Sequence, residues 1–162
     1  MPPYTCTTCG QVHTDLPHIG SAAPFHWADA LAQDPNSLLT NDLCIIEGRD
    51  FFIHGVIEIP VHDYEYEFGW GVWVSHKKEN FATYREQFDT AAIGPFFGWL
   101  CTKIAYYPET TLELKTMAHF RGGGFRPRII LEESQHPLYH QQRNGISLSE
   151  AWKLVHHYDG KP

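Results

Sequence analysis

The residues with the clearest capacity for chemistry stand near the first residue of the chain. Cys6 and Cys9 are separated by two residues, Gly10 follows directly, and His13 lies three residues further on. Two thiolates at this spacing occupy one edge of a tetrahedron around Zn²⁺, and the glycine lets the backbone fold over the sulfur atoms. The spacing therefore predicts one structural zinc ion per chain, held by a knuckle-like hairpin over residues 1–14.

The other two zinc ligands have to come from single residues, chosen among His13, Cys44, Cys101 and the remaining histidines. His13 is close in sequence, and Cys44 enters the first predicted sheet strand. The predicted metal ligands are therefore Cys6, Cys9, His13 and Cys44. Two alternatives stay open, a pair of reduced thiols without metal and a thiol redox pair. The redox motif normally opens a helix within a βαβ unit, whereas this one lies between β-type residues.

A catalytic zinc is less consistent with the sequence than a structural one. Catalytic sites keep one coordination position open and often use a His-Glu-x-x-His motif, which this chain lacks. The nearest substitute is His136 with His140, one turn apart on a predicted helix. Because Pro137 makes His136 the expected N-cap, we interpret this pair as a capping histidine and a surface histidine.

Two further groups of polar residues have a simple structural interpretation. The open face of the predicted sheet has side chains that could take part in general acid–base catalysis. Their spacing in the sequence does not identify a nucleophile or a pair of carboxylates, so no catalytic residue is assigned. These residues are His54, Glu58, Glu65, Glu67, Trp73, Lys115, His119 and Arg121. Arg121, Arg126 and Arg128 surround three glycines, which indicates either a small anion site or a solvated turn.

The glycines of the Gly69-Trp70-Gly71-Val72-Trp73 run are also ambiguous. They leave either a slot for a ligand or room for a neighbouring aromatic ring to lie flat on the strand, and the second arrangement is the more common one.

Composition limits the class of protein. The chain has 162 residues, of which 43% are hydrophobic and 14% aromatic, and a formal net charge of −7. These values predict one folded domain over residues 1–162 and give no electrostatic basis for nucleic acid or an anionic membrane. The sequence shows no secretory signal and no apolar run long enough for a membrane span, so we expect a cytoplasmic protein with reduced thiols.

The hydrophobic pattern predicts an α+β fold. In chain order we expect a helix over 24–33, strands over 43–47, 51–59 and 65–74, a helix over 75–88, strands over 96–101, 112–120 and 127–131, and helices beginning at Pro137 and after Ser147. The architecture is an antiparallel sheet of five or six strands over 43–131 with one inserted helix. Helices pack on one side, including the C-terminal ones within 135–158. In the strand over 65–74 the even-numbered residues face the core and the odd-numbered ones a partly open face.

The order of several segments resembles a known bacterial family. They are residues 6–13, Asp42-Leu43-Cys44, residues 51–53 and 58–60, residues 70–74, Phe97-Gly98-Trp99-Leu100, Tyr107-Pro108, Leu114-Lys115, His136-Pro137-Leu138, Gln142 and Gly145-Ile146. Together they resemble the domain of unknown function 2199, from about Cys6 to Ile146. The resemblance implies a bacterial, cytoplasmic, single-domain protein and supplies no catalytic residues.

The sequence therefore favours a zinc-binding protein that is not an enzyme and that acts by binding a protein partner. The first alternative is a metal-dependent hydrolase with a histidine-containing site, and the second is a thiol redox protein. No oligomeric state is predicted.

Overall fold

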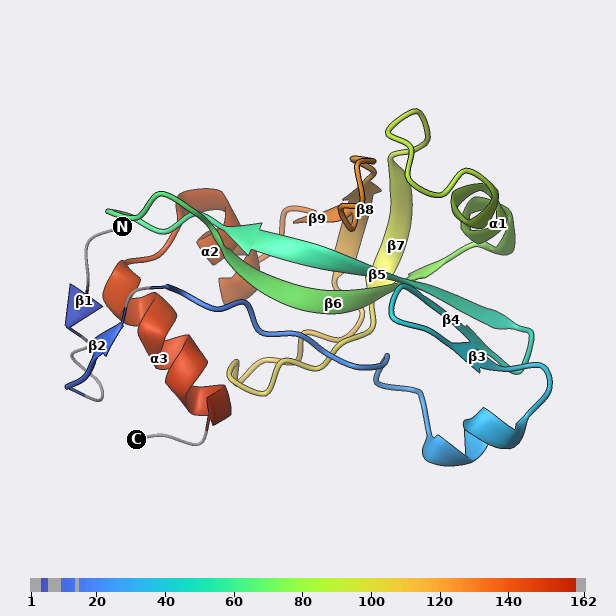
Figure 1. Cartoon of the computed structure of the whole chain (residues 1–162), viewed down its shortest axis with the longest axis horizontal. Coiled ribbons are helices and arrows are strands. Elements are labelled where there is room, and N and C mark those ends of the chain that lie inside the picture. Colours follow the sequence, from blue (N-terminus) through green and yellow to red (C-terminus); the bar gives the residue numbers. More distant parts are fainter. Residues whose placement is uncertain (1–3, 6–9, 14, 160–162) are drawn as a thin grey trace.

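The structure is a computed structural model that describes residues 4–5, 10–13 and 15–159. It is a mixed α+β fold (Figure 1). The strands are β1 (Tyr4–Thr5), β2 (Val12–His13), β3 (Leu38–Leu39), β4 (Leu43–Ile46), β5 (Asp50–Ile59), β6 (Phe68–His76), β7 (Phe96–Leu100), β8 (Lys115–His119) and β9 (Arg128–Leu131). The helices are the 3₁₀ helix η1 (Asp29–Gln33), α1 (Lys78–Glu86), α2 (Pro137–Asn144) and α3 (Leu148–Asp159).

The main sheet is closed, which corrects the expected simple antiparallel sheet. Strands β3 to β9 follow one another in sequence order with antiparallel neighbours, and β9 also pairs with β5 in parallel at Val56 and Arg128. The five strands β5 to β9 thus form a barrel. Closure is possible because one edge of the ten-residue β5 serves two partners, pairing with β4 as far as Ile53 and with β9 at Val56.

A glycine on β5 allows the barrel to close. A Cβ atom at Gly55 would lie 2.6 Å from two side-chain carbons of Ile129 and 2.9 Å from the carbonyl oxygen of Pro127. The next residue, Val56, donates its backbone N–H to that same Pro127 oxygen at 3.0 Å. Only glycine leaves room for β9 to come this close to β5.

A side chain from α2 satisfies the free edge of β9. The Gln142 carboxamide oxygen accepts the Leu131 N–H at 2.8 Å, and its nitrogen donates to the Ile129 carbonyl at 2.8 Å. Gln142 therefore takes the place of a neighbouring strand at this edge, where unpaired backbone groups would otherwise be exposed.

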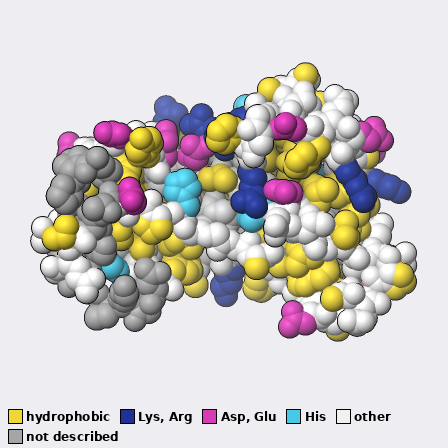
Figure 2. Space-filling view, viewed as in Figure 1, with side chains coloured by type: hydrophobic (Ala, Val, Ile, Leu, Met, Phe, Trp, Pro, Cys, Tyr) yellow, Lys and Arg dark blue, Asp and Glu magenta, His cyan; other side chains and the backbone are white. Residues whose placement is uncertain are grey.

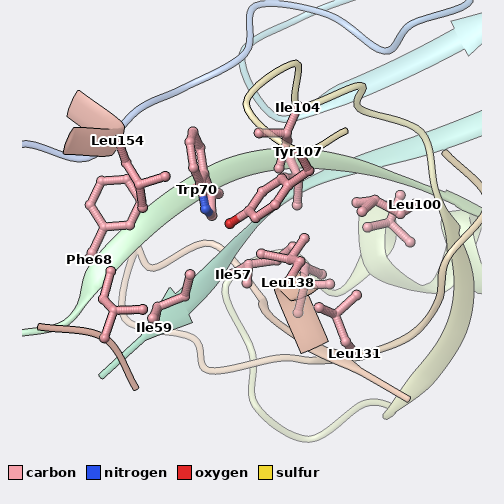
Figure 3. Close-up of a cluster of buried hydrophobic side chains, with 14 of the residues drawn as sticks. Ile57, Ile59, Phe68, Trp70, Leu100, Ile104, Tyr107, Leu131, Leu138 and Leu154 are labelled. Carbon is pink, nitrogen blue, oxygen red and sulfur yellow. The ribbon is translucent and has the colours of Figure 1, made fainter. Parts of the chain in front are cut away.

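The inner face of the sheet holds the larger core. As the alternation predicted, Phe68, Trp70, Val72 and Val74 point into it, and each is at most 2% exposed. Tyr66, expected on the same face, instead lies before β6 and is 62% exposed. All three α-helices add buried residues to the same core, and Figure 3 shows Leu138 of α2 and Leu154 of α3 together with Ile57, Trp70 and Tyr107.

The outer face is covered near β4 to β6, which corrects the expectation of a partly open face. Trp73 is fully buried in a second cluster with Cys44, Phe52 and Cys101. The cover comes from the N-terminal segment through Trp27, Leu31 and Leu39, which pack against this cluster. Only Asp29–Gln33 of the predicted 24–33 helix is helical, as a 3₁₀ turn, and the strand β3 that follows was not predicted.

The same N-terminal segment fills the space beside the β6 glycines. Ile19 donates its N–H to the Gly69 carbonyl at 3.0 Å and accepts the Gly71 N–H at 2.7 Å. The His18 ring lies 2.6 Å from the point where a Gly69 Cβ would be. A ring therefore lies against Gly69, as expected, whereas Gly71 faces the backbone of Gly20, and the chain's own residues occupy the slot.

Local capping signals were predicted well for the last two helices and poorly for α1. His136 Nδ1 accepts the Leu138 N–H at 3.0 Å at the start of α2, and Ser147 Oγ accepts the Glu150 N–H at 3.1 Å at the start of α3. Ser75, expected to cap α1, is instead part of β6, and Lys77 is the N-cap without a side-chain hydrogen bond. None of the helices within the described ranges is both long and apolar enough to cross a bilayer.

Replacing Gly55 tests the barrel closure. We expect Gly55→Ala to lower the free energy of unfolding by about 1–3 kcal/mol, because the methyl group would overlap Ile129 and the Pro127 oxygen. Gly20→Ala is the matched control, since nothing lies within 4 Å of its Cβ position. Urea denaturation of both variants makes the comparison. Equal stability of the two would contradict the close approach of β9 to β5.

Candidate functional site: an aromatic groove beside β7

A hollow of about 600 Å³ lies where the N-terminal cover of the outer face ends. We call it the aromatic groove. Its principal lining residues are Phe52, His76, Lys77, Phe97, Trp99 and Glu113. These residues come from β5, from the end of β6, from β7 and from the segment before β8, so the closed barrel fixes their relative positions.

Two exposed aromatic side chains of β7 form one wall of the groove. Phe97 and Trp99 point outward while Gly98 and Leu100 between and beyond them are buried. Phe97 is 38% and Trp99 43% exposed, and their ring centroids are 5.2 Å apart at an interplanar angle of 87°. The Lys115 ammonium lies 5.9 Å from the Trp99 ring centroid, within range of a cation–π contact.

The floor of the groove is formed by a close approach of β6 to β7. A Cβ at Gly98 would lie 2.3 Å from the Ser75 carbonyl oxygen and 2.3 Å from a Val74 methyl carbon. The Ser75 hydroxyl accepts the Trp99 N–H at 3.3 Å. This contact fixes the backbone beneath the Trp99 ring.

The N-terminal segment forms the opposite wall. His26 stacks on Phe52 with ring centroids 6.3 Å apart, and the 55% exposed Phe25 meets His26 edge-on at 5.6 Å. The Phe25 N–H donates to the Cys101 carbonyl at 2.8 Å, which anchors this wall to the strand end after β7. On the face drawn in Figure 2, hydrophobic side chains gather mainly over the right half, the end that holds β3, β4 and α1 in Figure 1.

His76 is a buried polar residue of the groove. It is 8% exposed, and neither ring nitrogen makes a hydrogen bond of normal geometry with a described residue. Burial lowers the pKa of His76 to about 4, although the nearby backbone of Phe97 acts in the opposite direction. His76 is therefore neutral at neutral pH.

The thiol of Cys101, which also lines the groove, is not in its reactive thiolate form at neutral pH. Cys101 is 5% exposed, and burial raises its pKa, although contacts with Ser75 oppose the shift. A neutral histidine beside a protonated thiol supplies neither a strong base nor a thiolate nucleophile. The groove is therefore better suited to binding than to covalent chemistry.

The predicted zinc ligands are only partly described. Cys6 and Cys9 and the side chain of His13 lie outside the described residues, while the backbone of His13 pairs with Tyr4. Cys44 is fully buried in the outer cluster, and burial raises the pKa of its thiol to about 12. In Figure 1, β1 and β2 lie toward the same end of the long axis as α3, whereas β4 lies toward the other end. The ligand set Cys6, Cys9, His13 and Cys44 stays a prediction.

The other candidate residues have structural partners. His136 uses both ring nitrogens, capping α2 and contacting the Glu109 carbonyl at 3.1 Å, and His140 is exposed, so the interpretation of this pair is confirmed. His54 is buried, stacked on Trp73 at 4.4 Å, with Nδ1 2.8 Å from the Asn41 oxygen. No group of three or more His, Cys, Asp or Glu side chains within the described ranges is arranged to hold a metal ion.

Two of the three arginines near the three glycines are paired with carboxylates. Arg121 pairs with Glu58 at 2.5 Å, and Arg126 pairs with Asp42 at 3.1 Å. Both arginines line a small hollow of about 120 Å³ that also contains Asp89. The described surroundings therefore favour the solvated-turn interpretation over an anion site.

Comparison with known proteins identifies a family. A family model described as "Uncharacterized protein conserved in bacteria (DUF2199)" matches residues 5–146, which is most of the chain. The chain belongs to the DUF2199 family. No curated protein and no solved structure matches it. The match confirms the resemblance found from the sequence, and the DUF2199 description assigns no activity.

The lowered pKa of His76 predicts a pH dependence of stability. In the unfolded chain His76 becomes protonated below its ordinary pKa of 6.5, whereas in the folded protein it stays neutral down to about pH 4. Between these two pH values the proton binds preferentially to the unfolded state, so the stability of the fold decreases as the pH falls. We expect this group alone to remove about 2 kcal/mol between pH 7 and pH 5. In urea titrations at several pH values, His76→Gln should lose this part of the pH dependence of the free energy of unfolding. His119→Gln, which changes an exposed histidine, should retain it. Identical slopes for wild type and His76→Gln would contradict the buried, neutral state of His76.

Proposed function

We propose that this DUF2199 protein is a protein-interaction module without catalytic activity, and that the aromatic groove is its binding surface. The observation that carries the proposal is the pair of exposed rings, Phe97 and Trp99, held side by side on a barrel strand at the edge of a hollow of about 600 Å³. Large aromatic side chains in concave sites contribute strongly to protein recognition, because they bury much area at little cost in conformational entropy.

The chemistry of the groove supports binding rather than turnover. His76 is neutral, the thiol of Cys101 is protonated at neutral pH, and Ser75 is engaged with the backbone of Trp99. Of the histidines considered for a hydrolase, His136 caps α2 and His54 stacks on Trp73. No observation favours the hydrolase or the redox alternative specifically.

A structural zinc at Cys6 and Cys9 is the second part of the proposal. It rests on the Cys-x-x-Cys-Gly spacing alone. Its function would be to hold the segment before Leu16, from which the N-terminal cover of the outer face continues.

Peptide selection tests the binding function. A display library of random twelve-residue peptides, panned on the immobilised protein, should yield binders that lose at least tenfold in affinity with Trp99→Ala, because the exposed ring is removed from the groove. Tyr66→Ala is a matched control, since it removes another exposed aromatic side chain that does not line the groove. Binders that ignore Trp99→Ala, or no binders at all, would contradict the proposal.

Metal analysis tests the zinc site. Protein purified without chelator should contain about one zinc per chain, and Cys6→Ser should lose both the zinc and several degrees of thermal stability, because metal binding is coupled to folding. Cys44→Ala decides the fourth ligand, since loss of zinc in that variant assigns Cys44 and retention excludes it. Zinc-free wild-type protein would rule out the site.

A further inference from the structure

The two ends of the aromatic groove carry opposite charges. Lys77 lies at the end where β6 leads into α1, and Glu113 lies at the other end, before β8. Arg49 and Asp50 also line the groove, but Arg49 is engaged with Glu47 at 2.7 Å and with Asp50 at 4.0 Å. No described carboxylate lies within ion-pair distance of Lys77.

The first turn of α1 strengthens the positive end. This helix is nine residues long, its N-cap Lys77 has an extended backbone, and within the described part of the chain no side-chain capping hydrogen bond is formed at its start. Free N–H groups and the helix dipole favour negative charge at such a position. Glu79 is the acidic residue of the first turn, and Lys77 and Lys78 offset it.

His76 supplies the independent observation that points to a ligand. It lines the groove directly before Lys77 and is more than nine-tenths buried, and neither ring nitrogen makes a hydrogen bond of normal geometry with a described residue, although the Phe97 backbone lies close to the ring. Buried polar atoms are nearly always paired in folded proteins, so an unpartnered pair at a binding surface calls for an explanation. An acceptor on a bound partner would provide the missing hydrogen bond.

We infer that the partner segment bound in the aromatic groove carries an aspartate or glutamate next to an aromatic or large apolar side chain. Its carboxylate lies at the Lys77 end and its apolar side chain packs on Phe97 and Trp99. This inference rests on the proposed function and adds the chemistry of the partner. Because the whole chain carries a net charge of −7, attraction of an acidic segment has to be local, which makes Lys77 decisive.

Three synthetic peptides test the chemistry. The first is an acetylated, amidated seven-residue peptide with two aspartates beside two aromatic residues; the second and third replace the aspartates by asparagine and by lysine. Isothermal titration against the full chain should give the order aspartate, asparagine, lysine, with at least tenfold between the first and the last. Binding of the aspartate peptide should also raise the pKa of His76, followed by NMR of its ring, because a nearby carboxylate favours the charged imidazole.

Charge variants assign the preference to the groove. Lys77→Glu should reverse the order of the three peptide affinities, and Lys77→Gln should make the three affinities nearly equal. Lys153→Glu makes the same charge change on α3, at an exposed site outside the groove, and should leave the order unchanged. Thermal melts confirm that each variant is folded.

The possible failures are distinguishable. If the peptides bind in a Trp99-dependent manner but with equal affinity, or if Lys77→Glu changes nothing, the acidic-partner inference is wrong while the binding function stands. If no peptide binds in a Trp99-dependent manner, both are wrong. Tighter, Trp99-dependent binding of an eight-nucleotide oligothymidine than of the aspartate peptide would also overturn the inference, because the groove would then recognise nucleic acid.

Discussion

The structure depends on the single place where the barrel closes. At Gly55 and Val56, β9 meets the same edge of β5 that pairs with β4 as far as Ile53. A side chain at Gly55 as small as a methyl group would prevent this contact. Because β5 is paired with β6 from Phe51 to Ile59, closure at this point fixes β6, and through it β7 and β8. The relative positions of all the groove residues on these strands follow from that contact.

Closure also separates two surfaces with different roles. The inner face is filled by Phe68, Trp70 and the apolar sides of the three α-helices, and Figure 3 shows the contributions of Leu138 from α2 and Leu154 from α3. On the outer face, the N-terminal segment covers Trp73 and its neighbours and then stops beside Phe52. Trp99 stands directly beyond this cover, since Ser75 pairs with Phe52 on one side and with Trp99 on the other. The aromatic groove is therefore the uncovered continuation of a buried surface.

Local features of the fold could be predicted from the sequence, and long-range ones could not. Alternating residues located β5 and β6 and the inward face of Phe68 and Trp70, and capping chemistry located α2 and α3. Barrel closure rests on one pairing between residues 72 positions apart, for which Gly55 gives no local signal of a partner. The N-terminal segment that covers the outer face has almost no regular secondary structure, so its hydrophobic residues do not recur at a helical or strand spacing. The groove was missed for the same reason, although the outward spacing of Phe97 and Trp99 on a predicted strand was a usable signal.

The most direct test of this account is to locate a bound peptide by intermolecular nuclear Overhauser effects. Isotope-labelled protein with an unlabelled selected peptide reports which side-chain protons lie within about 5 Å of the ligand. We predict contacts from the peptide to the rings of Trp99 and Phe97, together with a shift of the Lys78 amide at the start of α1. Contacts confined to surfaces away from β7, with the signals of Trp99 and His76 unchanged, would contradict the assignment of the aromatic groove as the binding site.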